Sequence, residues 1–373
     1  MTERKRQSNF ELMRIIAMLM IIGSHLACHG IQHVTSTVDS YQIYLSGTDL
    51  NKAFISFLNM GGEVGVAIFF MITGYFQINK NKYSLSKILV ETVFYGWFSF
   101  ALLIVAHGMG YKISEIGLKD DLNFTMEALL NPVSSGMWWF VTAYVLLLIL
   151  SPYINRISWD LNYKGWIFIL ALIWGLWYSV GYIYKPPFYS LQKAIYFYIL
   201  GAFCRIHLKN LKSRLLYILL EIIFWGMGTL LFWEMGEHFN ITGEVNYIFI
   251  LFNVVKTALI VPACSYILFK IFESLKIHNS RIIDLVASST FGVYLIHDSL
   301  VSRNFIWYNL FKVDTLYSSK LFPLYAILII IIIFGVCTII DFFRIKYIEP
   351  LSDKLINKIF EKIKVNFIKT EKI

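Results

Sequence analysis

Two ionisable residues in the first apolar stretch of the chain have types and a spacing that suit group-transfer chemistry. Arg14 and His25 are eleven residues apart, so on a helix they share one face and lie about 16 Å apart along its axis. Arginine can hold a polyanionic donor, and histidine can act as a base or nucleophile near neutral pH. Two ordinary roles stay open, because Arg14 could reach the headgroups or pair with Glu11, and His25 could be a neutral imidazole bonded to another helix.

The spacing of two histidines raises the question of a metal. His25 and His29 are four residues apart, with Cys28 beside them. The H-E-x-x-H arrangement typical of zinc enzymes also has a glutamate between the histidines, and this stretch has none. We therefore expect no metal site.

A second apolar segment, rich in glycine, carries Glu63 at its outer end and Tyr75 at its inner end. Gly61 and Gly65 are spaced for the close packing of two helices. Packing does not explain Glu63, which could orient or charge-balance His25 or simply face water. We favour contact with water and keep Glu63 and Tyr75 as supporting or substrate-contacting candidates.

A polar stripe occurs late in the chain, in an otherwise apolar run. Tyr294 and His297 are three residues apart, and Tyr294 and Asp298 are four apart, so a helix would point all three toward one side. Such a stripe favours a cavity that water can enter over contact with lipid.

Two adjacent tryptophans, Trp138 and Trp139, open another apolar run at its predicted outer boundary. An aromatic belt at the membrane surface accounts for them without any further role. A platform for stacking a sugar ring is the alternative, since indole faces also bind apolar sugar surfaces.

Composition identifies the kind of element that must hold these residues. Hydrophobic residues make up 57% of the 373 residues and charged residues only 15%, which excludes a soluble or a disordered chain. Runs of about 20 apolar residues are long enough to cross a bilayer. The sequence predicts an all-α, polytopic membrane helix bundle of about ten transmembrane helices, at roughly residues 10–29, 54–76, 87–107, 137–154, 165–184, 189–206, 215–235, 246–270, 282–301 and 321–343.

The distribution of lysine and arginine orients this bundle. The net charge is +9, but the cations gather in alternate connecting segments and in the tail, as the positive-inside rule requires, so both termini are expected in the cytoplasm. No basic face suits a nucleic acid. We divide the chain into a membrane domain, residues 1–345, and a lysine-rich cytoplasmic tail, residues 346–373, whose apolar positions suggest an amphipathic helix on the inner leaflet. Those positions are Leu351, Leu355, Ile359, Ile363 and Phe367.

Taken in order, four features resemble the acyltransferase 3 family of integral membrane acyltransferases over about residues 8–345. They are Arg14 with His25, the segment Phe69-Phe70-Met71-Ile72-Thr73-Gly74-Tyr75, the segment Trp138-Trp139-Phe140, and Phe291-Gly292-Val293-Tyr294-Leu295-Ile296-His297. Thr73 stands where the family usually has serine, and Lys80, Lys82 and Lys87 stand where many members have arginines.

The resemblance implies an O-acetyltransferase that takes an acyl group, usually acetyl, from cytoplasmic acetyl-CoA. The acceptor would be a hydroxyl of a cell-surface or exported polysaccharide, or of a lipid-linked saccharide. In that mechanism Arg14 holds the coenzyme and His25 is the general base or the acyl carrier, with no bound cofactor. The resemblance also implies a multi-pass protein of a bacterial plasma membrane that modifies the cell envelope.

Two other functions remain open at this stage. The same polar groups could line the path of a transporter or flippase for a lipid-linked sugar, without acyl transfer. They could also belong to a membrane sensor or scaffold, although no soluble output domain is expected.

Overall fold

The computed structural model describes residues 6–31, 43–80, 85–110, 126, 129–159, 161–175, 189–208, 213–242 and 247–354. Its described residues form helices and connecting turns, with no strand among them. The helices, including short π-helical turns marked η, are α1 Ser8–His25, η1 Leu26–Ile31, α3 Asp49–Gln77, α4 Ser86–Gly108, α6 Trp139–Trp159, α7 Tyr163–Leu172, α9 Tyr189–His207, α10 Arg214–Thr242, α11 Tyr247–Val255, η3 Lys256–Ile260, α12 Val261–Glu273, α13 Arg281–Ser288, α14 Thr290–His297, α15 Leu300–Asn304, η4 Phe305–Leu310, α16 Val313–Leu316, α17 Phe322–Phe343 and η5 Arg344–Ile348. The predicted all-α class is confirmed for these residues.

Several of these helices are long and apolar enough to cross a membrane. Among the described residues seven stretches qualify, and each overlaps one of the ten predicted runs: Ser8–Ile31, Asp49–Gln77, Ser86–Gly108, Trp139–Ser158, Arg214–Gly236, Leu251–Glu273 and Phe322–Lys354. The three other runs are 165–184, which lies partly outside the described residues, 189–206, which forms α9, and 282–301. A total of ten spans therefore stays a prediction.

The run at 282–301 is not one continuous helix, contrary to the sequence-based expectation. It forms α13, α14 and α15, with interruptions at Ser289 and at Asp298. The side chain of Thr290 donates to the Ala287 carbonyl at 2.9 Å, and that of Ser299 accepts from the Ser302 amide at 3.1 Å. Hydroxyl side chains that bond to their own backbone compete with the helical ladder, which explains the breaks.

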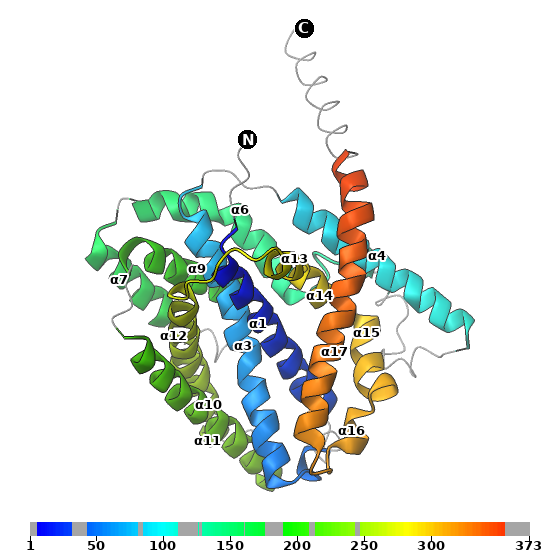
Figure 1. Ribbon diagram of the computed structural model, residues 1–373. Coiled ribbons are helices and arrows are strands. Elements are labelled where there is room, and N and C mark those ends of the chain that lie inside the picture. The colour runs from blue at the N-terminus through cyan, green and yellow to red at the C-terminus, as the bar shows by residue number, and fades with distance from the viewer. Residues whose placement is uncertain are drawn as a thin grey trace.

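The centre of the bundle is the close pair α1 and α3, which run side by side (Figure 1). A Cβ atom at Gly65 would lie 2.6 Å from the Ala17 carbonyl oxygen, and one at Gly61 would lie 3.0 Å from Met20 Cβ. The predicted role of Gly61 and Gly65 in close packing is confirmed, since any larger residue would push α1 away. This pairing fixes α1, the helix that carries Arg14 and His25.

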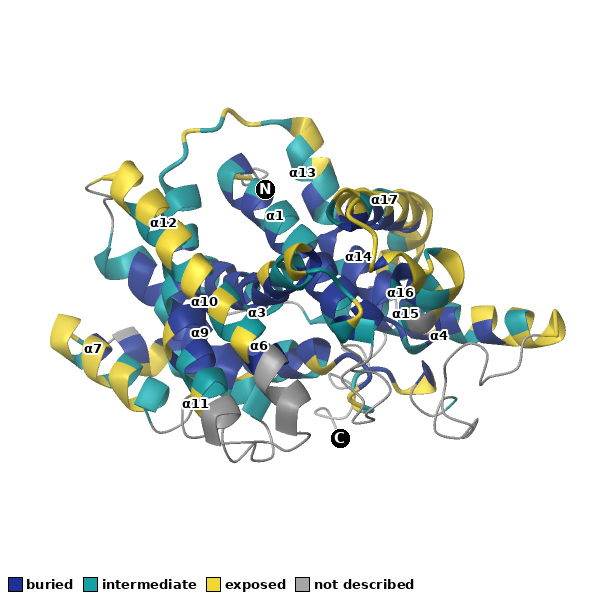
Figure 2. Cartoon of the chain, turned by 90° about the horizontal axis from the view of Figure 1, so that it is seen from below, coloured by how far each residue is buried: buried dark blue, intermediate teal, exposed yellow. Residues whose placement is uncertain are grey.

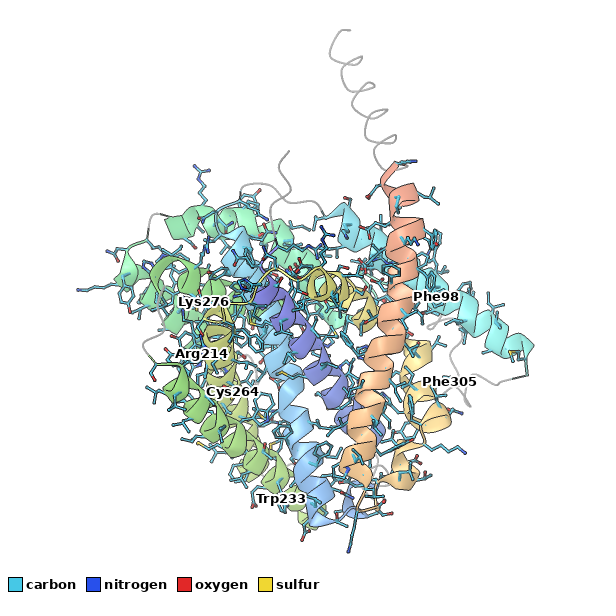
Figure 3. All side chains as sticks on the ribbon, viewed as in Figure 1. Phe98, Arg214, Trp233, Cys264, Lys276 and Phe305 are labelled. Atoms are coloured by element: carbon cyan, nitrogen blue, oxygen red, sulfur yellow. The ribbon has the colours of Figure 1, made fainter. Side chains whose placement is uncertain are left out.

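Apolar side chains remain exposed on the periphery of the bundle. Exposed residues follow the outer faces of α4, α10 and α17, while the residues of α3, α9 and α14 are largely buried (Figure 2). Long helices with an apolar outer face suit contact with lipid chains. At the rim, Arg214 donates to the Ser274 carbonyl at 2.9 Å and so ties the start of α10 to the end of α12 (Figure 3).

The first and last long helices share one end of the bundle. Helix α1 begins where α17 ends, at the top of Figure 1. After Phe343 the helix continues through η5 to Lys354 with no break at 345. The division into a membrane domain and a tail stays a prediction, because Leu355, Ile359, Ile363 and Phe367 lie outside the described residues.

Candidate functional site

The C-terminal end of α1 meets the C-terminal end of α14, and both carry polar groups that the sequence analysis selected. His25 is the last residue of α1, before the π-helical turn η1, a form of helix that is frequent at functional sites. Its Nδ1 lies 2.9 Å from Nε2 of His297 and 3.6 Å from Oδ1 of Asp298. The structure thus unites His25 with two members of the predicted polar stripe, 272 residues away in sequence for His297.

Hydrogen bonding determines which nitrogen of His25 is available. Nδ1 of His297 lies 2.6 Å from the Val293 carbonyl oxygen, which can only accept, so this nitrogen carries the proton. In neutral His297 Nε2 is then an acceptor, and Nδ1 of His25 must donate to it. The free lone pair of His25 is consequently on Nε2, and His297 fixes this tautomer.

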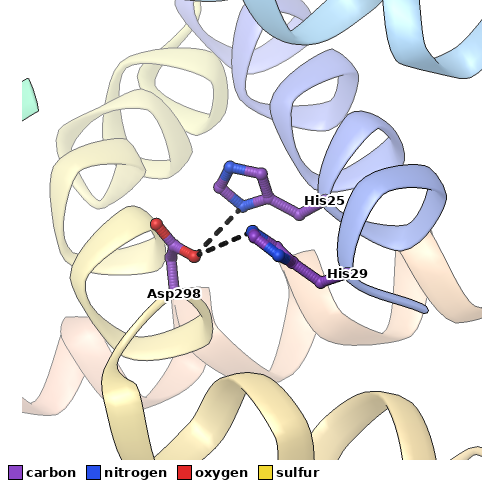
Figure 4. Close-up of side chains that lie close together, drawn as sticks. All are labelled: His25, His29 and Asp298. Carbon is purple, nitrogen blue, oxygen red and sulfur yellow. Dashed lines mark ion pairs between the residues drawn. The ribbon is translucent and has the colours of Figure 1, made fainter. Parts of the chain in front are cut away.

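Asp298 is the charged centre of the group. Its Oδ1 accepts from Nε of Arg303 at 2.9 Å, and Nε2 of His29 lies 3.8 Å from the same oxygen. Figure 4 shows His25 and His29 reaching from one helix toward this carboxylate. The Asp298 side chain is only 4% exposed, and burial of its charge is compensated by the guanidinium of Arg303.

His25 opens into a cavity of about 240 Å³ that is lined by residues of α1, η1, α3, α6, α9 and α14. We call it the His25 cavity. Its lining includes the predicted residues His25, Glu63, Trp139 and Tyr294. Polar groups of four separate segments therefore surround one space.

Glu63 neither contacts His25 nor simply faces water, so the favoured interpretation of this residue was wrong. Its carboxylate pairs with Lys193 of α9 and Lys256 of η3, each at 3.2 Å. Both lysines are buried and Glu63 is 28% exposed. The three form a cluster with a net charge of +1, and two of them, Glu63 and Lys193, line the His25 cavity.

Arg14 lines a second cavity, of about 310 Å³, which we call the Arg14 cavity. Its cationic residues are Arg6, Arg14 and Lys87. Arg14 also lies 3.4 Å from Glu11, the partner considered from the sequence, and remains 35% exposed. Arg14 therefore lies close to Glu11 and lines the cavity at the same time.

The two cavities share part of their walls. Four residues line both: Ile21, Val66, Phe140 and Tyr294. Tyr294 packs edge-on against Phe140, with ring centroids 5.6 Å apart. The cavity that contains Arg14 and the cavity that contains His25 are therefore adjacent along α1 and are separated by these four side chains.

The two tryptophans have different environments. Trp138 is fully buried and lines neither cavity, so it cannot stack on a ligand. Trp139 is 40% exposed, lines the His25 cavity and has Nζ of Lys193 at 5.8 Å from its ring centroid. Of the pair, only Trp139 can contact a substrate in this cavity.

Tyr75 lies away from both cavities. Its hydroxyl accepts from Arg205 at 3.0 Å, and its ring packs against Phe10 and Phe269. These contacts join α3 to α1, α9 and α12 and explain Tyr75 by packing alone.

Some polar residues of the site were not predicted. Arg303, Lys193 and Lys256 carried no local pattern and had been assigned to connections or helix interiors, whereas His29 was considered and set aside. Arg6 and Lys87 were interpreted as orientation signals. Their positions in the site depend on tertiary packing, which spacing along the chain does not reveal.

Comparison with known proteins supplies one match. A family model described as an acyltransferase domain matches residues 7–342, which covers α1 to α17 and both cavities. No curated protein and no solved structure matches the chain.

Proposed function

Since the chain belongs to the acyltransferase 3 family and is a membrane acyltransferase, we propose that it moves an acetyl group from cytoplasmic acetyl-CoA to a hydroxyl of a cell-surface or exported polysaccharide. The observation that carries the proposal is the pair of adjoining cavities along α1, one with Arg14 and one with His25. Such a pair suits a donor and an acceptor that approach from opposite sides of a membrane.

The Arg14 cavity is the donor site in this proposal. Arg6, Arg14 and Lys87 line it, with Glu91 as the one acidic residue among its described lining residues, and guanidinium and ammonium groups bind the phosphates of a coenzyme through charge-assisted hydrogen bonds. A volume of about 310 Å³ is within the usual range for sites that bind small molecules. The thioester end of the donor would point along α1 toward Tyr294.

His25 carries the chemistry. Its Nε2 takes the proton of the acceptor hydroxyl while the hydroxyl oxygen bonds to the thioester carbon, and the carbon–sulfur bond then breaks. The proton passes to the leaving thiolate. If His25 instead carries the acetyl group, Nε2 bonds to the thioester carbon as the carbon–sulfur bond breaks and coenzyme A leaves as the thiolate. The acceptor oxygen then takes the acetyl group as the bond to Nε2 breaks, and the proton of the hydroxyl passes to the thiolate.

The acceptor would enter the His25 cavity beside Trp139, where an exposed indole can stack on a sugar ring. The proposal locates the chain in a bacterial plasma membrane as a multi-pass protein, with the Arg14 cavity on the cytoplasmic side. Its acceptor is then a polymer or lipid-linked saccharide of the envelope.

The deciding experiment compares the O-acetyl content of purified envelope polysaccharides, by NMR, between cells with the gene and cells without it. We expect the acetyl signals of one polymer to disappear while the polymer itself remains. Loss of the whole polymer would indicate transport of a lipid-linked sugar instead. Unchanged acetylation of every envelope polymer would contradict the proposed acceptor.

A further inference from the structure

Three side chains at the end of α1 and α14 have donor atoms in the arrangement of a metal site. One atom each from His25, His29 and Asp298 lies within 4.8 Å of the others. Asp298 Oδ1 is 3.6 Å from Nδ1 of His25 and 3.8 Å from Nε2 of His29. In tetrahedral zinc sites, bonds of about 2.0–2.1 Å separate the ligand atoms by about 3.4 Å. The carboxylate oxygen is therefore within about 0.4 Å of tetrahedral spacing from each imidazole, and the two imidazole nitrogens, at most 4.8 Å apart, would move toward each other around an ion.

The ligand types are those that zinc prefers. Two imidazoles and one carboxylate are a common set for zinc, and they leave a fourth position for water or another ligand. Spacing along the sequence indicated only the two histidines. The carboxylate that completes the set is that of Asp298, the residue that directly follows α14 (Figure 4). His29 and His25 both line the His25 cavity, which gives an ion access.

We propose that His25, His29 and Asp298 form a binding site for a divalent transition-metal ion of the zinc class. Such ions bind imidazole and carboxylate donors more tightly than magnesium or calcium does. Because the carboxylate of Asp298 is buried, an ion must give up most of its water shell to reach it. A small dication that bonds directly to the side chains is therefore favoured over one that keeps its water.

Arg303 competes with the ion for the same oxygen. Its Nε donates to Oδ1 of Asp298 at 2.9 Å, and its side chain is 27% exposed. The guanidinium can therefore turn toward water when a metal bonds to Oδ1. Removal of Arg303 is expected to tighten metal binding, a direction that a general loss of structure would not produce.

Metal binding has a chemical consequence for His25. The ion uses the lone pair of Nδ1, whereas His297 holds the proton on that nitrogen in the metal-free arrangement. Coordination transfers the proton of the neutral imidazole to Nε2, which then has no lone pair. The ion would thus block acetyl transfer, an effect that rests on the proposed function, whereas the binding itself does not.

The binding test uses the full chain, purified without a histidine tag and reconstituted in phosphatidylcholine nanodiscs. Each sample is dialysed against zinc chloride, its zinc content is measured by mass spectrometry, and affinity is measured by competition with a fluorescent chelator. The variants are His29→Gln and, as a matched control, His278→Gln, which removes an exposed histidine. His29→Asn serves as a second replacement if His29→Gln aggregates.

We expect one zinc ion per chain in the wild type and in His278→Gln, and an affinity about 100-fold lower in His29→Gln. Arg303→Gln should bind zinc about tenfold more tightly than the wild type, because Oδ1 is freed from a charge-assisted hydrogen bond. Equal affinity in the wild type and His29→Gln would overturn the site. Unchanged affinity in Arg303→Gln would overturn the assignment of Asp298 as a ligand.

A second arm measures acetyl transfer against zinc concentration, with each protein normalised to its own zinc-free rate. Wild type and His278→Gln should lose activity as zinc binds, and His29→Gln should need about 100-fold more zinc. If the wild type binds one zinc ion per chain and still transfers acetyl at its zinc-free rate, the metal site stands and His25 is not the reacting group. If the wild type binds no zinc and zinc does not slow acetyl transfer, the metal site is overturned and the proposed function is unaffected.

Discussion

Two buried carboxylates in this bundle each pair with an arginine, yet their surroundings differ. Asp341 on α17 is fully buried and accepts from Tyr95 at 2.7 Å and from Nε of Arg344 at 2.6 Å. Asp298, at the end of α14, accepts from Arg303 and lies beside the rings of His25 and His29. The arginine is 5% exposed in the first cluster and 27% exposed in the second.

The difference separates a structural role from a chemical one. Around Asp341 the partners are fixed charges and a phenol, and Arg344 also pairs with Glu91 and Glu349, so α4 and α17 are held together. A Cβ atom at Gly292 would collide with the Asp341 carboxylate, which brings α14 into the same contact. Around Asp298 the partners other than Arg303 are imidazoles, whose ring nitrogens can each donate or accept a proton, and His25 and His29 border a cavity.

The largest expected effect on the chemical side is that of His25→Ala. Loss of the group that transfers the proton should lower the rate of acetyl transfer by about 10²–10⁴-fold. The measurement is transfer of radiolabelled acetyl from acetyl-CoA by the reconstituted protein. Exposed His278→Ala is the matched control and should retain the wild-type rate. A His25→Ala protein that transfers acetyl at the wild-type rate would remove His25 from the mechanism.

On the structural side, Asp341→Ala should be the most costly substitution for stability. It leaves Arg344 buried with fewer partners, and such a loss costs about 3–5 kcal/mol. Asp298→Asn should cost about 1 kcal/mol, because Arg303 can turn to water. A thiol-reactive dye measures thermal unfolding, since Cys204, Cys264 and Cys337 are buried.

The contrast between the two carboxylate clusters is contradicted if Asp341→Ala and Asp298→Asn lower the unfolding temperature by the same amount. Equal unfolding temperatures would mean that the Asp341 cluster does not hold α4 against α17. Asp341→Ala protein that remains folded should keep its kcat, and any change should fall on KM for acetyl-CoA, because Glu91 of the same cluster lines the Arg14 cavity. Loss of kcat would assign a chemical role to the structural cluster.

His297→Ala tests whether acetyl transfer depends on the hydrogen bond by which His297 fixes the tautomer of His25. Without the acceptor at 2.9 Å, His25 is free to rotate and to move its proton, and kcat should fall by about 10- to 100-fold. KM for acetyl-CoA should not change, because Arg14 is untouched. His297→Gln keeps an acceptor oxygen and should recover part of the rate. A wild-type kcat in His297→Ala would show that His297 does not position His25.

Arg14→Gln should act on donor binding. Loss of one charge-assisted contact to phosphate should raise KM for acetyl-CoA by about tenfold, with a smaller change in kcat. Arg14→Lys, which keeps the charge, should be milder. A fall in kcat at constant KM would move Arg14 from donor binding to the chemical step.

The parts of the site that depend only on the regular repeat of a helix could be predicted from the sequence. Helix α1 is continuous from Ser8 to His25, so the shared face of Arg14 and His25 followed from the helical period. The spacing of His297 and of Asp298 from Tyr294 likewise indicated a common polar side, and the structure brings both to His25. Glycines at 61 and 65 predicted a close contact with another helix, and the structure identifies that helix as α1.

Contacts between distant segments could not be predicted in this way. Glu63 finds Lys193 across 130 residues, and nothing in the local pattern of α3 indicates that partner. The carboxylate near His29 depends on the break in the helix at Asp298, where Ser299 caps the next helix. A continuous helix, as the hydropathy of 282–301 suggested, would direct these groups differently.

The smallest expected effect is that of Tyr75→Phe, which tests where the site ends. Tyr75 belongs to a segment that resembles the family, but it lines neither cavity. Phenylalanine keeps the ring contact with Phe10, whose centroid is 4.8 Å away, and loses only the hydrogen bond from Arg205. The cost should be about 1 kcal/mol, a drop of about 2–4 °C in the unfolding temperature, with an unchanged transfer rate. A tenfold loss of transfer in a protein of normal stability would extend the chemical region to the C-terminal end of α3, because packing alone could not then account for Tyr75.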